Sequence, residues 1–241
     1  MTEMQLPPKA FFQGILRRRR IAAEIRPVIK ELKPCLKRMS AYLFSIYNED
    51  GLKKIPEMCR KAREQLTKIK ECYERLIDIV PDNEFHKYNN FFRYQTGRAA
   101  HLVLFLVYLE TGKLCSRKEF TEVIGVSKDQ NHHFPLNIDE YIHGSINMVQ
   151  DLVRFAVTCV TYGDYETPVQ IANFVINFNK SMSLLRVTKE GLRRRIRALN
   201  YNVKAIEDLI YDLSLRNHIK PDIILEARNT NELEKNAEAK G

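Results

Sequence analysis

Turn-forming residues are scarce in this sequence. Its 241 residues include 9 Gly and 9 Pro, and there is no Trp. A fold built from many short strands needs Gly, Pro or similar turn residues at close intervals, so their scarcity argues against a β-rich architecture. With 44% hydrophobic and 29% charged residues, the chain is typical of a folded protein with a sizeable core. The composition therefore favours long helices joined by few turns.

Cysteines are also few, and they stand far apart. No two of them form a CxxC pair, so the sequence predicts neither a zinc ribbon nor a disulfide framework; the five are Cys35, Cys59, Cys72, Cys115 and Cys159. Free thiols fit a reducing compartment.

The N-terminus lacks a basic-then-apolar signal pattern, and the longest apolar run, residues 99–109, is well short of the roughly 20 residues that cross a bilayer. We therefore expect a cytoplasmic and nuclear protein without a membrane partner.

Common catalytic motifs are missing as well. The patterns GxxxxGK[ST], GxGxxG, HExxH and GxSxG do not occur, although they mark many phosphate, dinucleotide, zinc and serine-hydrolase sites. His132 and His133 are adjacent, so they would diverge by about 100° on a helix, and we expect a solvated loop there. Asp164 and Glu166 are interpreted as helix-start residues. The sequence thus predicts no cofactor and no metal site.

Positive charge is in excess. The 39 Lys and Arg residues outnumber the 30 Asp and Glu residues and give a net charge of +9. This balance favours polyanionic partners, either nucleic acid or an acidic membrane surface. Charge alone does not choose between them.

Two apolar stripes predict a helical hairpin in the first third of the chain. Seven apolar residues over 25–46 follow a 4-3 spacing, which places them on one side of a helix. A second stripe over 58–80 ends at Pro81. Pro27 and Pro34 lie inside the first stripe, and an interior proline costs a helix about 3 kcal/mol. We therefore expect a kink or a break in the first helix.

A third helix is predicted from about residue 84 to residue 110, and capping residues set the next boundaries. Ser116 is followed three residues later by Glu119, and Asn137 by Glu140, which are capping-box spacings. The first box predicts a short helix through residue 124, and the second predicts a helix that runs to about residue 161.

The last two helices complete the predicted fold. Thr167 and Pro168 predict an N-cap and a first helical residue, in a helix that ends near residue 183. After Thr188, an a/d seam of three heptads predicts a helix that needs a partner, and we expect this seam to form an oligomer interface; it consists of Leu192, Ile196, Leu199, Val203, Ile206, Ile210 and Leu213. The fold class is therefore all-α: a single-domain antiparallel bundle of about six to seven helices over 1–219. A tail follows over 220–241, and its last ten or so residues are expected to be flexible.

Two basic features fit phosphate binding. The first is a run of four arginines, Arg17, Arg18, Arg19 and Arg20, which suits phosphate contacts or nuclear import; a solvated helix end is the alternative. The second combines rings with cations in the third helix, at Lys87, Tyr88, Arg93 and Arg98. Single strands bind to such mixtures because bases stack on aromatic rings while cations hold phosphates. The alternative is that the rings lie in the core and the cations lie in solvent.

Several long segments resemble the translin/trax family. They are HLVLFLVYLETGKLCSRKEFTEVIGV (101–126), IDEYIHGSINMVQDLVRFAVTCVTYGDYETP (138–168) and LRRRIRALNYNVKAIEDLIYDLSLR (192–216). Two shorter segments, EIRPVIKEL (24–32) and IPEMCRKAREQL (55–66), extend the resemblance in order over most of the chain.

The resemblance implies a fold, a ligand and a partner. Members of the family are all-α subunits of hollow, barrel-like octamers that bind single-stranded RNA and DNA. Translin also joins its paralogue trax in a mixed octamer, an endoribonuclease that removes passenger-strand fragments during activation of the RNA-induced silencing complex. In the VYLETG and NYNVKAIEDLIYDLSLR segments the chain is more similar to the translin branch than to the trax branch.

The resemblance also places the catalytic carboxylates of trax. They correspond to Ala99, Leu102, Asn147 and Asp151, of which only Asp151 is acidic. Magnesium-dependent phosphodiester cleavage needs several oxygen ligands, so we expect a non-catalytic, RNA-binding subunit. Two alternatives stay open: a metal-dependent ribonuclease that uses Asp151 with Glu110 or Asp139, and a helical scaffold that does not bind nucleic acid.

The nucleic-acid segment of the family corresponds to residues 87–93. Asn89 and Phe91 stand where an animal translin has histidines, and Phe92 replaces a tryptophan, so affinity at this segment is expected to differ. Residues 160–164 (VTYGD) resemble a GTP-contact motif of the family. They have no P-loop lysine, so five residues alone are not enough to predict nucleotide binding there.

Overall fold

The structure is a computed structural model that describes residues 9–48, 50–81, 84–124, 127–129, 132–133 and 136–219. The predicted tail over 220–241 lies outside the described residues. Within the described part, seven helices have eight or more residues: α1 (Lys9–Phe44), α2 (Ile55–Ile79), α4 (Arg93–Thr111), α5 (Arg117–Ile124), α6 (Ile138–Thr161), α7 (Glu166–Ser183) and α8 (Glu190–Leu215). These helices confirm the all-α class and the predicted six to seven helices.

Shorter elements link the long helices. Helix α3 (Phe85–Tyr88) precedes α4, and the 3₁₀ turns are η1 (Ser45–Tyr47), η2 (Leu52–Lys54) and η4 (Asn89–Phe91). Strands β1 (Ser127–Asp129) and β2 (His132–His133) pair antiparallel in a small hairpin. The loop predicted at His132 and His133 is therefore corrected to a strand, which periodicity does not reveal in so short a segment.

The chain divides into two compact units. The first comprises residues 1–44 and 56–144, and the second comprises residues 45–55 and 145–241. Helix α6 contributes its first seven residues to the first unit and the rest to the second. The sequence predicts a single domain over 1–219, and that statement stays a prediction.

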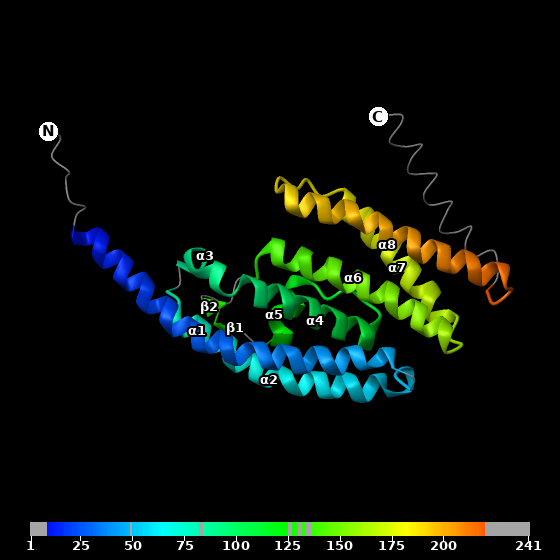
Figure 1. Cartoon of the computed structure of the whole chain (residues 1–241), viewed down its shortest axis with the longest axis horizontal. Coiled ribbons are helices and arrows are strands. Elements are labelled where there is room, and N and C mark those ends of the chain that lie inside the picture. The colour runs from blue at the N-terminus through cyan, green and yellow to red at the C-terminus, as the bar shows by residue number, and fades with distance from the viewer. Residues whose placement is uncertain are drawn as a thin grey trace. The chain divides into compact units, whose positions relative to one another are not determined.

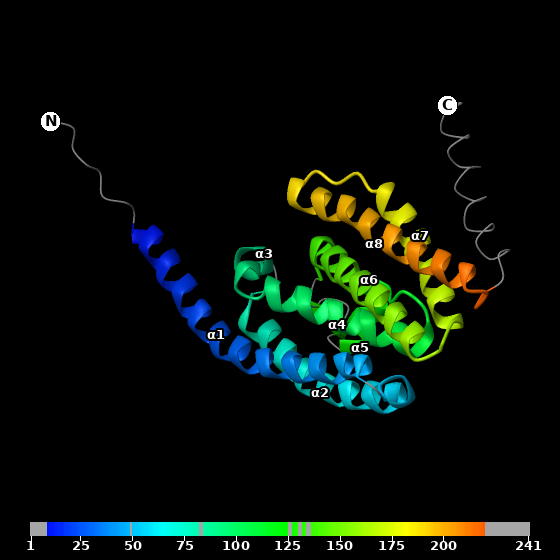
Figure 2. The same ribbon diagram turned by 45° about the vertical axis from the view of Figure 1, so that its right-hand side comes forward.

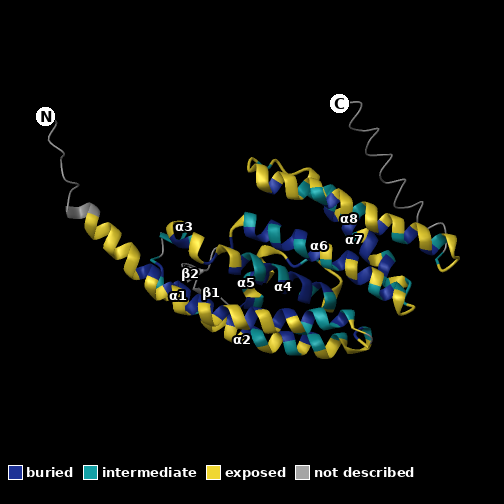
Figure 3. Ribbon diagram, viewed as in Figure 1, coloured by how far each residue is buried: buried dark blue, intermediate teal, exposed yellow. Residues whose placement is uncertain are grey.

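The helical hairpin of α1 and α2 forms one side of the first unit. Figures 1 and 2 show the two helices side by side, and the hydrogen bond from Arg38 to Gln65 (3.0 Å) and the ion pair of Arg75 with Glu31 join them. The predicted stripe of α1 is fully in the core: Ile25, Ile29, Leu32, Leu36, Met39 and Leu43 are all buried. Figure 3 shows this buried side, and it shows that residues 12–20 of α1 are exposed.

Both prolines lie inside a continuous helix. Helix α1 runs for 36 residues through Pro27 and Pro34, so a break does not occur. Figures 1 and 2 show a change of direction along α1 instead. A proline removes one backbone hydrogen bond and crowds the preceding turn, which bends a helix. The burial of the α1 stripe holds the helix together, because tertiary packing outweighs local propensity.

Helix α4 is the central helix of the first unit. Ten of its residues are buried, including the Leu102–Leu106 run. Gly144 of α6 lies against its backbone: a Cβ added there would come within 2.8 Å of the His101 nitrogen and 2.9 Å of the Ala100 Cβ. The close approach of these helices therefore requires glycine at 144. Gly112, at φ 69°, ends α4 with a left-handed residue, as helices commonly end.

The capping predictions are largely confirmed. The Ser116 hydroxyl accepts from the Glu119 backbone N–H at 3.2 Å, and the Glu119 carboxylate accepts from the Ser116 N–H at 2.6 Å. This reciprocal pair is a complete capping box. At the start of α7 the structure differs, because the helix begins at Glu166 and the Asp164 carboxylate accepts from the N–H groups of Glu166 and Thr167, both at 3.1 Å. Asp164 rather than Thr167 is therefore the capping side chain.

Helices α7 and α8 pack against one another in the second unit, and Figures 1 and 2 show them side by side. The a/d seam of α8 faces inward: Leu192, Leu199, Ile206, Ile210 and Leu213 are buried, and Ile196 and Val203 are half-buried. These five seam residues are therefore buried within the chain itself, without a second subunit. The exposed side of α8 carries Tyr201, Tyr211 and Leu215. A role for the seam between subunits stays a prediction.

Candidate nucleic-acid interface

The predicted third helix is divided into three elements. Instead of one helix over 84–110, the chain forms α3, the 3₁₀ turn η4 and α4, and Phe92 stands between η4 and α4 with φ −126°. The backbone carbonyl of Phe92 accepts from the N–H and the hydroxyl of Thr96 at 2.9 and 3.2 Å. Helix α4 therefore starts afresh at this point, with its own first turn.

Two buried rings of the segment and one buried carboxylate from outside it hold this break in place. Tyr88 and Phe92 are 3% and 2% exposed, so both rings are anchored in the core. The side chain of Asn89 hydrogen bonds to the carboxylate of Glu140, from the first turn of α6. Sequence reasoning used Glu140 only as a capping residue. Its contact with Asn89 depends on tertiary packing, so no local pattern could have indicated it.

Glu140 is the most unusual carboxylate near this segment. It is 7% exposed, and its Oε1 has no hydrogen-bond partner in the described part of the chain. Burial raises its pKa, while the hydrogen bonds from Asn89 and the Asn137 backbone and the nearby charge of Arg93 lower it. The net upward direction follows because desolvation of a charged group is the largest effect. Glu140 is therefore a buried acid that contacts Asn89 of η4 and lies near Arg93 of α4.

Lys87 and the first arginines of α1 lie near one another. The Arg18 guanidinium donates to the Lys87 carbonyl at 3.5 Å, and Glu84 pairs with Lys87 at 3.1 Å and with Arg17 at 3.8 Å. Sequence reasoning named these cations separately, and the structure brings them together around one acidic residue. The hydrogen bond from Lys87 and the charge of Arg17 lower the pKa of Glu84. Of the other arginines in the run, Arg20 pairs with Glu24 at 3.3 Å, and Arg19 is exposed.

The remaining predicted residues of this surface are on α4. Arg93 is exposed and Arg98 is half-buried, and neither forms an ion pair within 4 Å in the part of the chain that the structure describes. In the described residues, no carboxylate within ion-pair distance therefore competes with a phosphate for either guanidinium. Tyr88 is corrected to a core residue because of its burial. The exposed rings are Phe91, at 37%, and Tyr94, at 75%.

We define the α3/α4 face as the cations and exposed rings of the 84–98 segment together with the two arginines of α1 that contact its start. It consists of Arg17, Arg18, Lys87, Phe91, Arg93, Tyr94 and Arg98, and all belong to the first unit. Phosphates bind to Lys and Arg, and unpaired bases stack on exposed rings. The face therefore has both chemical groups that a single strand needs.

The four positions that the resemblance matches to carboxylates of trax lie in two different environments. In the first unit, Ala99 and Leu102 are buried and apolar. In the second unit, the Asn147 amide oxygen accepts from Arg195 at 3.3 Å, and the Asp151 backbone carbonyl accepts from the Tyr47 hydroxyl at 3.1 Å. The Arg154 guanidinium lies 4.3 Å from the Tyr47 ring centre. Burial and the charge of Asp151 raise the pKa of Tyr47.

The other candidates for metal or nucleotide chemistry have structural roles in the described residues. Glu110 pairs with Arg63 through two hydrogen bonds at 2.7 and 2.6 Å. Asp164, in the VTYGD segment, caps α7 as described above. Across the described residues, no three His, Cys, Asp or Glu side chains gather in a group that could hold a metal ion. In the same residues, no helix is long and apolar enough to cross a membrane.

Comparison with known proteins places the chain in a family. The pattern of the Translin family matches residues 20–217. Translin of Gallus gallus is 33% identical over 196 residues, which cover 81% of this chain and 86% of that protein. Translins of Mus musculus and Homo sapiens are each 32% identical over the same coverage. These matches do not distinguish the translin branch from the trax branch.

A solved structure supports the fold independently of sequence. The crystal structure described as apo-NeC3PO superposes with a TM-score of 0.61 at 11% sequence identity. The match covers 86% of this chain and 98% of that one. At so low an identity the likeness shows the fold alone, and it agrees with the all-helical architecture described above.

Proposed function

The chain belongs to the translin family, and from that premise we propose that it binds single-stranded RNA and DNA through the α3/α4 face. Single-stranded RNA is the proposed biological ligand. Binding is electrostatic, because the face offers Lys and Arg side chains to phosphates. The exposed rings of Phe91 and Tyr94 add stacking with unpaired bases, which favours single strands over duplexes.

The observation that carries this proposal is that Lys87, Arg93 and Arg98 are close in sequence and have few or no ion pairs in the described residues. They lie on one short segment, and the exposed rings of that segment are interleaved with them. Arg93 and Arg98 have no ion pair in the described residues, and Lys87 has only an exposed one. An exposed pair is worth at most about 1 kcal/mol, so a phosphate can replace Glu84. The cations are therefore available at little cost in free energy.

Assembly strengthens this binding. We propose a homo-octamer with a hollow interior, and a mixed octamer with trax, in which several α3/α4 faces meet one strand. Linked sites raise apparent affinity without any new contact, because each further contact becomes intramolecular. Membership of the translin family supports an oligomeric assembly. The number of subunits and the trax partner are part of the proposal. The corresponding cellular role is RNA processing, including activation of the RNA-induced silencing complex, in the cytoplasm and nucleus.

We propose that the chain is the non-catalytic subunit of the mixed assembly. The α6 positions that would carry carboxylates are occupied by Asn147, which accepts from Arg195, and by Asp151. The α4 positions are buried Ala99 and Leu102. One carboxylate does not provide the several oxygen ligands that hold a catalytic magnesium ion.

The test removes the three cations together. In the Lys87→Ala, Arg93→Ala, Arg98→Ala variant, we expect weaker binding of a fluorescent single-stranded RNA and a smaller dependence of binding on salt. Loss of three phosphate contacts lowers the slope of log affinity against log salt by about 2 on single strands. The matched control removes three exposed cations of α2, through Arg60→Ala, Lys68→Ala and Lys70→Ala, and keeps the slope. Equal slopes in the two triple variants would reject the α3/α4 face.

Two further measurements separate the alternatives. Pure protein incubated with labelled single-stranded RNA and Mg²⁺ is expected to leave the RNA intact. Cleavage that disappears in Asp151→Ala would instead favour the ribonuclease alternative. Absence of any salt-dependent binding would favour the scaffold alternative.

A further inference from the structure

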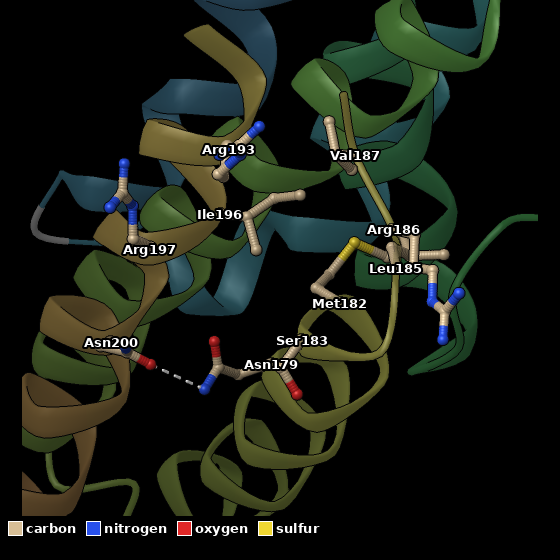
Figure 4. Close-up of a pocket in the computed structure, with 10 residues that line it drawn as sticks. All are labelled: Asn179, Met182, Ser183, Leu185, Arg186, Val187, Arg193, Ile196, Arg197 and Asn200. Carbon is tan, nitrogen blue, oxygen red and sulfur yellow. Dashed lines mark hydrogen bonds between the residues drawn. The ribbon is translucent and has the colours of Figure 1, made fainter. Parts of the chain in front are cut away.

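A pocket lies between α7 and α8, in the second unit. None of the residues that line it belongs to the α3/α4 face. Its volume is about 370 Å³, at the lower end of the range of about 300–1,000 Å³ for small-molecule sites. Figure 4 shows its three walls. They are the end of α7, the connecting segment 184–189 and the first turns of α8.

The inside of the pocket is apolar. Figure 4 shows Ile196 of α8 and Met182 of α7 directed into the space, with Val187 of the connecting segment facing them. At one end the side chain of Asn179 donates to that of Asn200 at 3.0 Å. A flat heteroaromatic ring can lie against such an apolar lining, and each amide has hydrogen-bonding capacity left for the edge of the ring.

The rim of the pocket is cationic. Arg186, Arg193 and Arg197 line it, and no acidic residue does. In Figure 4, Arg186 and Arg197 lie on opposite sides of the opening, with their guanidinium groups directed outward. An anionic group therefore finds a cation on each side of the apolar space rather than within it.

These arginines can exchange their ion pairs with carboxylates for contacts with phosphates. Arg197 and Arg193 pair with Glu190 at 2.9 and 3.4 Å, and all three side chains are more than half exposed. Such pairs contribute at most about 1 kcal/mol each, so a phosphate can take the place of Glu190. Arg186 forms no ion pair within 4 Å in the described part of the chain.

We propose that this pocket is a second contact for a single strand, in which one unpaired base enters the apolar space while Arg186 and Arg197 hold the phosphates on either side. Cations on both sides suit a nucleotide within a strand, because that nucleotide has a phosphate before it and another after it. A base in a duplex is stacked and paired, so it does not enter. The proposal rests on the proposed function, and it adds a site on α7 and α8 to the α3/α4 face.

The first experiment maps the contact. A single-stranded RNA with 4-thiouridine in place of uridine is crosslinked to the full-length protein by light, and the modified peptides are identified by mass spectrometry. We expect crosslinks in residues 179–200 as well as in the α3/α4 face. Crosslinks only in the α3/α4 face would overturn the second contact and leave the proposed function intact.

The second experiment either fills the pocket or removes the charges at its rim. Ile196→Trp occupies the apolar space, and the Arg186→Ala, Arg197→Ala pair removes the phosphate contacts. In both variants we expect at least about fivefold weaker binding of the RNA, the lower end of what one base contact contributes. The matched control, Arg194→Ala with Lys204→Ala, removes two exposed charges of α8 that do not line the pocket. It is expected to bind more tightly than the arginine pair variant.

The outcomes separate the two proposals. Thermal melting of Ile196→Trp controls for misfolding, and its mass in solution controls for loss of assembly, because Ile196 also belongs to the predicted oligomer seam. The arginine pair variant tests the site without changing the apolar lining. Wild-type affinity in both variants would overturn the second contact. Uridine 5′-monophosphate is titrated in parallel: binding of this free nucleotide as tight as that of the strand, lost in Ile196→Trp, would replace the strand site by a mononucleotide site. Absence of RNA binding in the wild type would overturn both proposals.

Discussion

Glu84 sets how much positive charge the α3/α4 face presents to a phosphate. Its carboxylate holds Lys87 at 3.1 Å and Arg17 at 3.8 Å, and the Lys87 hydrogen bond lowers its pKa. The two cations are more than half exposed, so each pair is worth at most about 1 kcal/mol. In the proposed interface, phosphates compete with this carboxylate. Since about 1.4 kcal/mol is a tenfold change in affinity, Glu84→Gln is expected to bind single-stranded RNA about two- to tenfold more tightly at low salt.

The assay is a fluorescence anisotropy titration over a series of salt concentrations. The gain from Glu84→Gln is expected to shrink as salt rises, because salt screens exposed charges. The control is Glu64→Gln on α2, which also removes one negative charge and one exposed ion pair, with Arg60. It is expected to leave affinity almost unchanged. Equal gains in the two variants would show that net charge alone matters, and an unchanged or weaker affinity in Glu84→Gln would refute the reasoning.

Three further predictions concern stability. Gly144→Ala is expected to destabilise the protein by about 1–3 kcal/mol in urea unfolding, because the new Cβ meets the His101 backbone. The control is Gly97→Ala in α4, where an added Cβ has no atom within 4 Å, and it is expected to be neutral or stabilising. Equal losses of stability in the two variants would contradict the close approach. Ser116→Ala removes a cap of α5 and is expected to cost about 1 kcal/mol, and an unchanged urea midpoint would contradict that role. Burial raises the pKa of four thiols, to about 11 for Cys59, Cys72 and Cys115 and to about 12 for Cys159. Because unfolded thiols lose protons first, stability is full below about pH 8.5 and falls as pH rises toward 11, by at most about 1.4 kcal/mol per pH unit for each thiol; constant stability from pH 8 to 10.5 would refute this.

The sequence was sufficient where local patterns decide the structure. The heptad stripe over 25–46 predicted the buried side of α1, and Ser116 with Glu119 predicted a capping box that the structure contains. These features depend on residues within one or two helical turns. The resemblance to a family added the all-α assembly and the expected ligand, which composition alone could not identify.

The sequence was insufficient where distant residues decide. Tyr88 and Phe92 are four residues apart, which fits a continuous helix, so nothing local indicated the turn η4 between them. The contact of Asn89 with Glu140, 51 positions later in the sequence, is tertiary. Since the break changes which side chains face outward, sequence reasoning named Tyr88, which is buried, and did not name Tyr94, which is exposed. The pairing of Lys87 and Arg17 through Glu84 has the same tertiary origin.

Packing decided between the two outcomes expected for α1. A kink or a break was expected at Pro27 and Pro34, and the helix changes direction but stays continuous, with its apolar side buried. The free energy from that burial, roughly 1.5–3 kcal/mol for each large apolar side chain, exceeds the cost of two prolines. The number of buried side chains was predictable, but the path of the bent helix was not.

The most direct test of the central claim compares single-stranded RNA with a duplex of the same sequence. The wild-type protein is titrated with each fluorescent RNA from low to physiological salt. Tight binding that prefers the single strand and weakens steeply with salt is the predicted result, because cations hold the phosphates and exposed rings stack on unpaired bases. Equal affinity for the duplex, or no binding to the single strand at low salt, would contradict the assignment of the α3/α4 face as a single-strand interface.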